Sequence, residues 1–132
     1  MSVHWHDWLE QAGVMLGEVR NALDSDSLIT VAFFSQQVAE QSLKALWLVR
    51  GDGLLPHTHD LMELAEGLEV PEEVRSDCQL LNPLYTISRY PDAANGLPAR
   101  NFNTTMAAGY VAAAERVNAW CASQLHDQGH GP

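Results

Sequence analysis

The segment Leu28–Val49 most constrains the fold, because it is apolar on more than one side when placed on a helix. One side carries Val31, Phe34, Val38, Ala45 and Leu48, and another carries Ala32, Ala39, Leu43 and Leu46. Such a helix is central in a bundle or is covered by a second subunit. Its small residues also allow neighbouring helices to approach closely. The pattern therefore predicts a central helix with other helices packed around it.

Four further segments are expected to be helical. Apolar residues at steps of three and four form one stripe over residues 3–23, which predicts a helix there. A short helix is expected to begin at His59 or Asp60 and to reach Gly67. A fourth helix spans residues 71–88 and should kink or divide at Pro83, and the last spans residues 104–125. No run alternates as a strand does. We predict an all-α, up-and-down bundle of about five helices: two long and antiparallel, one short connector, a kinked fourth and a long final helix.

Turn residues separate these segments. Gly51-Asp52-Gly53 is expected to end the second helix through glycine's tolerance of positive φ. Residues 89–100 contain two prolines and a glycine and are predicted to form an ordered loop. The glycine-rich tail from about residue 126 to 132 is expected to be mobile.

Composition narrows the class of protein. The 132 residues suit one domain, 1–132, and no run is apolar enough to cross a membrane. The N-terminus lacks a secretory pattern, so we expect a cytoplasmic protein, with Cys78 and Cys121 as ordinary thiols rather than a disulfide or metal site.

A net charge of −10 argues against an extended nucleic-acid-binding surface, although a local basic pocket is compatible with it. We expect the four tryptophans in the core or an interface.

A polar strip interrupts the central helix. Gln37, Gln41 and Lys44 recur at steps of four and three, and Glu40 can pair with Lys44. One interpretation is a solvated or salt-bridged strip. The other is that Gln37, Glu40 and Lys44 line a ligand cleft, because polar groups on an apolar helix need partners.

Arg89-Tyr90-Pro91-Asp92 is the sharpest candidate site. Arginine suits bidentate contact with phosphate, tyrosine can stack on a base, and Asp92 can accept hydrogen bonds from backbone or sugar. The alternative is a structural corner in which Arg89 pairs with Asp92 or Glu40. His59-Asp60 has a similar ambiguity, between capping the short helix and contacting a ligand or acting as a base. The histidines offer too few ligands nearby for a metal, so no metal or catalytic residue is assigned.

Three stretches carry a resemblance to a known family: Phe34–Leu46 in the second helix, His59-Asp60-Leu61, and Arg89-Tyr90-Pro91-Asp92. Their order and spacing resemble the HEPN domain, a name that stands for "higher eukaryotes and prokaryotes nucleotide-binding". The resemblance covers about residues 5–125. It implies an up-and-down helical bundle, often a homodimer, that is frequently encoded beside a minimal nucleotidyltransferase.

The resemblance implies a binding module of a two-component, toxin–antitoxin-like system. It would contact a nucleotide such as ATP between the second helix and the Arg89 loop, and it would need no other cofactor. The candidate nucleotide-binding residues are Arg89, Tyr90, Asp92, Gln37, Glu40, Lys44 and His59. A metal-independent HEPN ribonuclease and a purely structural dimeric partner are the alternatives. The ribonuclease pattern, an arginine followed after four to six residues by a histidine near the start of the last helix, is absent there. Arg50 and His57 fit its spacing at the wrong place, which favours a protein that is not an enzyme.

Overall fold

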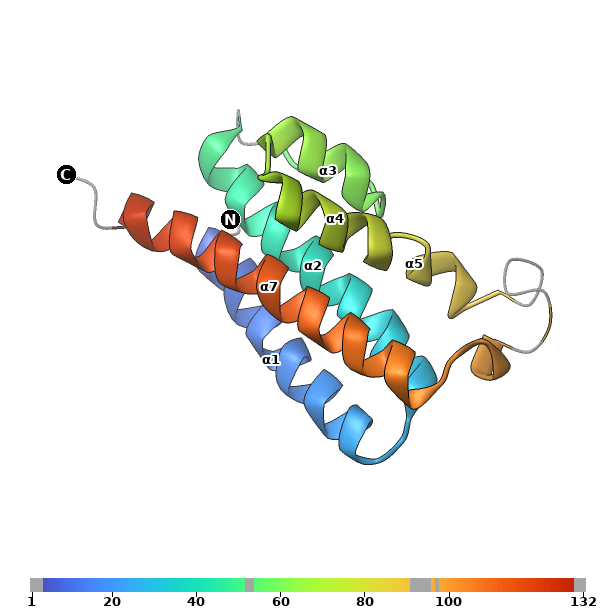
Figure 1. Ribbon diagram of the computed structural model, residues 1–132. Coiled ribbons are helices and arrows are strands. Elements are labelled where there is room, and N and C mark those ends of the chain that lie inside the picture. The colour runs from blue at the N-terminus through green and yellow to red at the C-terminus, as the bar shows by residue number, and fades with distance from the viewer. Residues whose placement is uncertain (1–3, 52–53, 91–95, 97, 130–132) are drawn as a thin grey trace.

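The computed structural model describes residues 4–51, 54–90, 96 and 98–129. The elements are α1 (Trp5–Asp24), α2 (Leu28–Arg50), α3 (Leu61–Leu68), α4 (Glu72–Leu81), α5 (Leu84–Ile87), the 3-10 helix η1 (Pro98–Asn101) and α7 (Thr104–Gly129). Strands are absent from the residues described. The predicted all-α helical bundle is therefore confirmed, and Figure 1 shows α1, α2 and α7 as its long helices.

Helix α2 lies at the centre of the bundle, as its two apolar sides predict. It packs against α1, α3, α4, α5 and α7, and Val31, Val38, Leu43 and Leu46 are fully buried. Burying apolar surface on several sides of one helix is the main source of stability in such a bundle. The neighbouring helices of the same chain thus account for α2's unusual composition.

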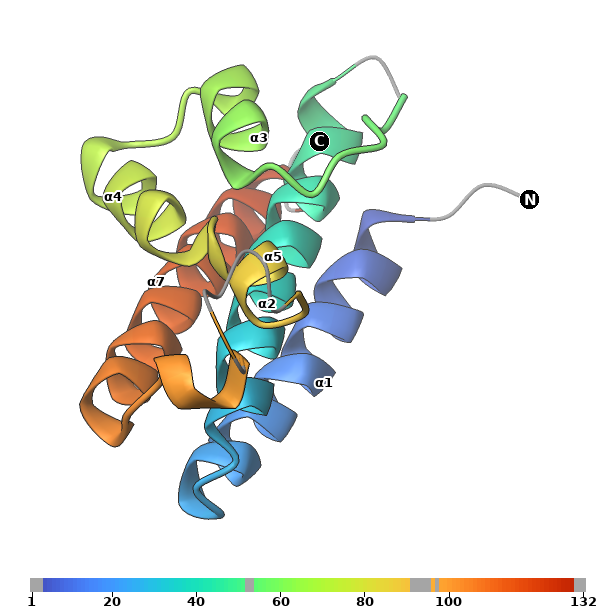
Figure 2. The same ribbon diagram turned by 90° about the vertical axis from the view of Figure 1, so that its right-hand side faces the viewer.

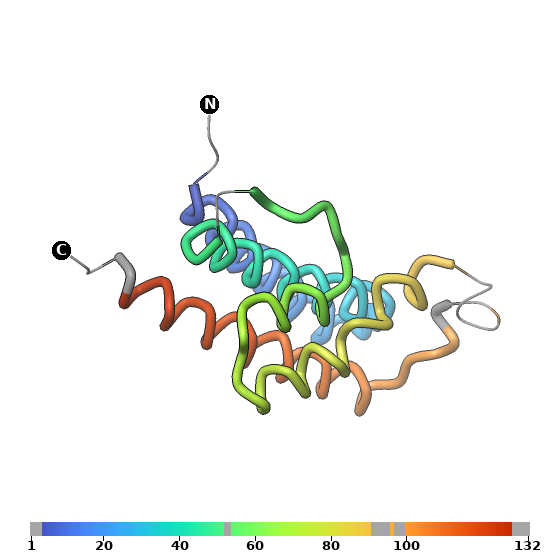
Figure 3. The backbone as a smooth tube through the Cα atoms, turned by 90° about the horizontal axis from the view of Figure 1, so that it is seen from above, coloured from blue at the N-terminus to red at the C-terminus, as the bar shows by residue number. Residues whose placement is uncertain are grey.

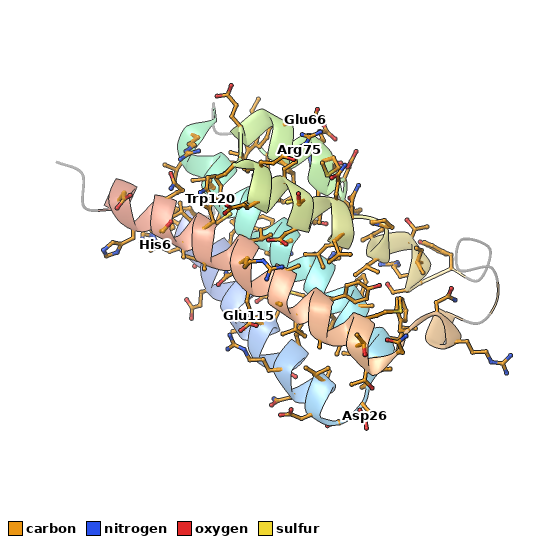
Figure 4. All side chains as sticks on the ribbon, viewed as in Figure 1. His6, Asp26, Glu66, Arg75, Glu115 and Trp120 are labelled. Carbon is orange, nitrogen blue, oxygen red and sulfur yellow. The ribbon has the colours of Figure 1, made fainter. Side chains whose placement is uncertain are left out.

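The directions of the long helices follow from their contacts. Lys44 of α2 lies over the Trp8 ring of α1, and the two helices are joined by a tight turn, so they are antiparallel. Helix α7 runs parallel to α2, because Asn118 donates a hydrogen bond to Ser42 and Gln124 accepts one from Arg50. Glu115 of α7 pairs with Arg20 of α1 at 2.8 Å, and Figure 4 labels Glu115 on α7. All four tryptophans pack against the core, as predicted.

Helices α3 and α4 form a hairpin over one end of α2. The chain after α2 turns back along that helix before α3 begins (Figure 3). Helix α3 then runs in the direction of α2 until Arg50 donates to the Leu68 carbonyl. Figure 4 shows Glu66 of α3 beside Arg75 of α4, a pair 3.4 Å apart. Asp77 of α4 accepts two hydrogen bonds from Arg116 of α7, each 2.9 Å long, which secures α4 against the long helices.

The fourth predicted helix, which was expected to kink or divide at Pro83, is divided into two helices, α4 and α5. Helix α4 ends at Leu81 and α5 begins at Leu84, since Pro83 cannot donate a backbone hydrogen bond within a continuous helix. The Asn82 side chain spans the break, accepting from the Leu61 backbone at 2.8 Å and donating to Asp60 at 3.0 Å. The start of α3 is therefore anchored to the α4–α5 junction.

Three local predictions differ from the structure. Helix α2 ends at Arg50 with Gly51 as its C-cap, as expected, but Gly51 has a φ of −86°, so positive φ at this residue does not end the helix. The lack of a side chain at Gly51 matters instead, because a Cβ would lie 2.8 Å from the Trp47 carbonyl oxygen. Residues 98–101, expected in a loop, form η1, and α7 continues to Gly129 through the start of the predicted mobile tail. Residues 130–132 lie outside the described ones, and no described helix is long and apolar enough to span a membrane.

Gly67 permits a close approach between α3 and α2. A Cβ there would lie 2.3 Å from the Trp47 ring, which is also held by a hydrogen bond to the Leu54 carbonyl. We predict that Gly67→Ala lowers the free energy of unfolding by about 1–3 kcal/mol, because the ring must move. Urea denaturation would measure it. Gly13→Ala is the matched control, because its Cβ meets nothing within 4 Å and a helical alanine should stabilise by about 0.5–1 kcal/mol. Equal effects of the two substitutions would contradict the role of Trp47.

Cys78 and Cys121 are free, fully buried thiols. Burial raises the pKa of Cys78 to about 12 and also raises that of Cys121. Since the thiolate is the reactive form, we predict that a disulfide reagent modifies the folded protein slowly at about pH 8. Both thiols should react rapidly once a denaturant unfolds the chain. Rapid modification of the folded protein would show that the α4–α7 contact opens readily.

Candidate functional site

The polar strip of α2 is an internal network centred on the Glu40 carboxylate. Its oxygen Oε2 accepts from Lys44 Nζ at 3.1 Å, and Oε1 accepts from the amides of Gln36 at 3.3 Å and Gln37 at 3.4 Å. Glu40 is 3% exposed and Lys44 is 8% exposed. A buried carboxylate needs this many donors to offset its lost hydration. The strip is therefore salt-bridged, and its charged pair is buried rather than solvated. The interpretation that it lines a ligand cleft stays a prediction.

His59 completes this network from the connection before α3. Its Nδ1 lies 2.9 Å from Glu40 Oε1, and its backbone carbonyl accepts from Gln36 Nε2 at 3.1 Å. The next residue, Asp60, caps α3 by accepting from the Met62 backbone, which is one of the two roles expected for it. The imidazole ring also stacks on Tyr85 of α5, with centroids 4.0 Å apart and planes 14° apart. His59 is therefore held on two sides while 53% of its side chain stays exposed.

Arg89 follows α5 and lies against the same tyrosine. A turn fixes its backbone, which donates to the Thr86 carbonyl at 3.1 Å. The guanidinium carbon is 4.9 Å from the Tyr85 ring centroid, 5.5 Å from that of Phe33 and 5.6 Å from that of Tyr90. These are cation–π distances. Within the described part of the chain the guanidinium has no ion pair and no hydrogen bond, and Arg89 is exposed.

An open groove of about 370 Å³ adjoins Arg89 between α2 and the end of α5. Figure 2 shows α5 lying over α2 in this region. The groove is lined by Ile29, Thr30, Phe33, Phe34, Ser88 and Arg89. Its walls are mostly apolar and aromatic, with Arg89 as the charged group at one edge. This composition suits a ligand that has both a flat ring and an anionic group.

The predicted site residues fall into three places. Arg89 and Tyr90 lie at the surface beside the groove, where Tyr90 is 47% exposed. Glu40 and Lys44 lie in the buried network and His59 at its edge, with Gln37 half-buried between them. Asp92 lies outside the described residues, so its pairing with Arg89 stays a prediction. The alternative pairing with Glu40 is not among Glu40's contacts, which are with residues of α2 and His59.

Sequence reasoning missed the aromatic part of the site. Phe33 and Tyr85 hold the Arg89 guanidinium, and Tyr85 also supports His59. Two signals could have found them. Phe33 precedes Gln37 and Glu40 by one and two helical turns, and Tyr85 precedes Arg89 by four residues. Phe33 therefore lies on the same face of α2 as two selected residues, and Tyr85 lies close in the chain to Arg89.

The Arg50–His57 pair is not assembled as a catalytic unit by the contacts observed. The Arg50 guanidinium donates to the Leu68 carbonyl and to Gln124, and it lies 5.6 Å from the Trp120 ring centroid. These contacts tie α2 to α3 and α7. The role of Arg50 visible in the structure is to hold helices together.

Comparison with known proteins places this arrangement in a family. A model of the HEPN domain matches residues 5–124, which is most of the chain. This chain belongs to the HEPN domain family. The resemblance drawn from its three motifs is therefore confirmed.

Two solved structures share the HEPN fold of this chain. One is the crystal structure of TT1696 from Thermus thermophilus, with 31% identity, a TM-score of 0.81, and coverage of 90% of this chain and 96% of that one. The other is ST0689, described as an archaeal HEPN homologue, with 28% identity, a TM-score of 0.81, and coverage of 92% and 98%. No curated protein matched significantly.

The buried Glu40–Lys44 pair should be sensitive to loss of one partner. We predict that Glu40→Gln lowers the free energy of unfolding by about 3 kcal/mol, because it leaves the Lys44 ammonium buried without its counter-ion. Adding Lys44→Met should recover much of this loss. Glu115→Gln is a control at an exposed pair and should cost less than about 1 kcal/mol. Chemical denaturation of the wild type and these variants would measure the differences, and a fully stable Glu40→Gln protein would contradict the prediction.

Proposed function

We propose that this HEPN chain is a binding module that holds a nucleotide through its phosphate at Arg89. The observation that carries the proposal is an arginine whose position is fixed by three aromatic rings and whose hydrogen-bond donors are unused by the described residues. Guanidinium groups bind phosphate bidentately, and a guanidinium already held in place loses little side-chain entropy on binding. The site is therefore prepared for an anionic ligand.

The groove beside Arg89 supplies a surface for the base. Phe33 and Phe34 line it, and the exposed Tyr90 lies on another side of the guanidinium. Aromatic side chains stack on nucleobases of any identity, which adds to affinity without selecting one base. ATP is thus a suitable test ligand, although other nucleotides would fit the same chemistry.

The charge of the chain favours a small nucleotide over a long nucleic acid. With 17 acidic residues against 7 lysines and arginines, the surface repels an extended phosphate backbone. One outward-facing arginine can still bind a single phosphate group at short range. This balance supports a nucleotide ligand and argues against a wide RNA-binding face.

We further propose that the chain acts in the cytoplasm as a homodimer, beside a small nucleotidyltransferase in a toxin–antitoxin-like pair. Membership of the HEPN family supports this partnership, and the nucleotide site would give both proteins a shared ligand. Affinity purification from the native host, followed by mass spectrometry, tests it. A nucleotidyltransferase at about equal amount would support the pair, whereas a homo-oligomer without a partner would contradict it.

Calorimetric titration with ATP tests the binding site directly. We predict that the wild type binds and that Arg89→Ala weakens binding by at least about tenfold, because the charge-assisted contact to phosphate is lost. Arg20→Ala is the matched control, since it removes the same charge from a pair on α1 and α7. Absence of heat from the wild type at millimolar ATP would overturn direct binding. Equal losses in both variants would indicate a general effect of net charge.

A further inference from the structure

The tautomer of His59 is determined by its partners. A carboxylate can only accept hydrogen bonds, so His59 Nδ1, 2.9 Å from Glu40 Oε1, is the donor. In the neutral imidazole Nε2 is then an acceptor. Lys44, Gln36 and Gln37 hold Glu40 in place, and Glu40 in turn holds the orientation of the imidazole. The structure thus presents a fixed hydrogen-bond acceptor from a side chain that is 53% exposed.

This acceptor shares one neighbour, Tyr85, with the cation of the proposed nucleotide site. Tyr85 contacts both groups: its ring centroid is 4.0 Å from that of His59 and 4.9 Å from the Arg89 guanidinium carbon. The imidazole centroid and the guanidinium carbon can therefore be no farther apart than these two distances taken together. The sugar hydroxyls and the phosphates of one nucleotide span distances up to this order. Arg89 supplies donors for the phosphate, and His59 supplies an acceptor for a hydroxyl.

We propose that His59 Nε2 accepts a hydrogen bond from a ribose hydroxyl of the nucleotide held by Arg89, and that Glu40 is the positioning residue for this contact. The site would therefore select ribonucleotides over deoxyribonucleotides. This inference rests on the proposed nucleotide binding and specifies ribonucleotides as the class of ligand. Glu40 and Lys44 then serve the site without touching the ligand.

The preference for ribonucleotides follows from the His59 acceptor that a deoxyribonucleotide leaves without a hydrogen-bond donor. A ligand without the hydroxyl leaves the His59 acceptor facing a hydrogen or an ill-placed water molecule. Because His59 is partly exposed, water compensates for some of the loss. We expect a preference of about tenfold, in the range of one hydrogen bond. A merely structural His59 would give no preference.

The test is calorimetric titration with ATP, 2′-deoxyATP and 3′-deoxyATP at about pH 8, where imidazole side chains are generally neutral. We expect the wild type to bind one deoxy ligand about tenfold more weakly than ATP, which also identifies the hydroxyl. In His59→Ala the affinity for ATP should fall to that for the weaker deoxy ligand, whose own affinity should not change. His57→Ala, an exposed histidine two residues away, is the control and should keep the preference.

The outcomes separate this inference from the proposed function. Equal binding of all three ligands by the wild type would overturn selectivity while leaving the nucleotide site intact. A preference that survives in His59→Ala would overturn the role of His59. Absence of binding to every ligand would overturn both proposals. Circular dichroism of each variant would establish that its helices are retained.

Discussion

The ion pair between Glu40 and Lys44 is the interaction on which the rest of the candidate site depends. It places two opposite charges on the central helix in a nearly dry position, 3.1 Å apart. The carboxylate then takes donors from Gln36, Gln37 and His59, so one buried group fixes the connection before α3. Because buried ion pairs seldom add much net stability, the arrangement is better understood as a means of positioning.

Most of the fold was predictable from local patterns. The two apolar sides of the Leu28–Val49 segment indicated a central helix, and Pro83 indicated a break, because helical spacing and proline chemistry act over a few residues. The end of α7 was missed because its polar, glycine-containing last turn gives no apolar stripe. The reason why a glycine is needed at position 51 was also missed. It depends on the nearby Trp47 carbonyl, which leaves no room for a Cβ, rather than on the backbone angle of Gly51.

The candidate site was only partly predictable, because its parts come from separate elements. The residues of the strip and Arg89 were selected for their charge or polarity. The stacking of His59 on Tyr85 joins the connection before α3 to α5, and no spacing along the chain encodes it. One of the two interpretations of the polar strip placed Glu40 and Lys44 along a cleft, whereas packing against neighbouring helices leaves them only 3% and 8% exposed. Tertiary contacts decided which of these polar residues are buried and which stay exposed.

The two halves of the candidate site are carried by different elements. His59 is bonded to the central helix, whereas Arg89 follows α5, a helix of four residues that is separated from α4 by Asn82 and Pro83. A ligand touching both would bridge the central helix and α5, so its affinity depends on how α5 is placed against α2. Substitutions at the α4–α5 junction would therefore tune affinity without any contact to the ligand.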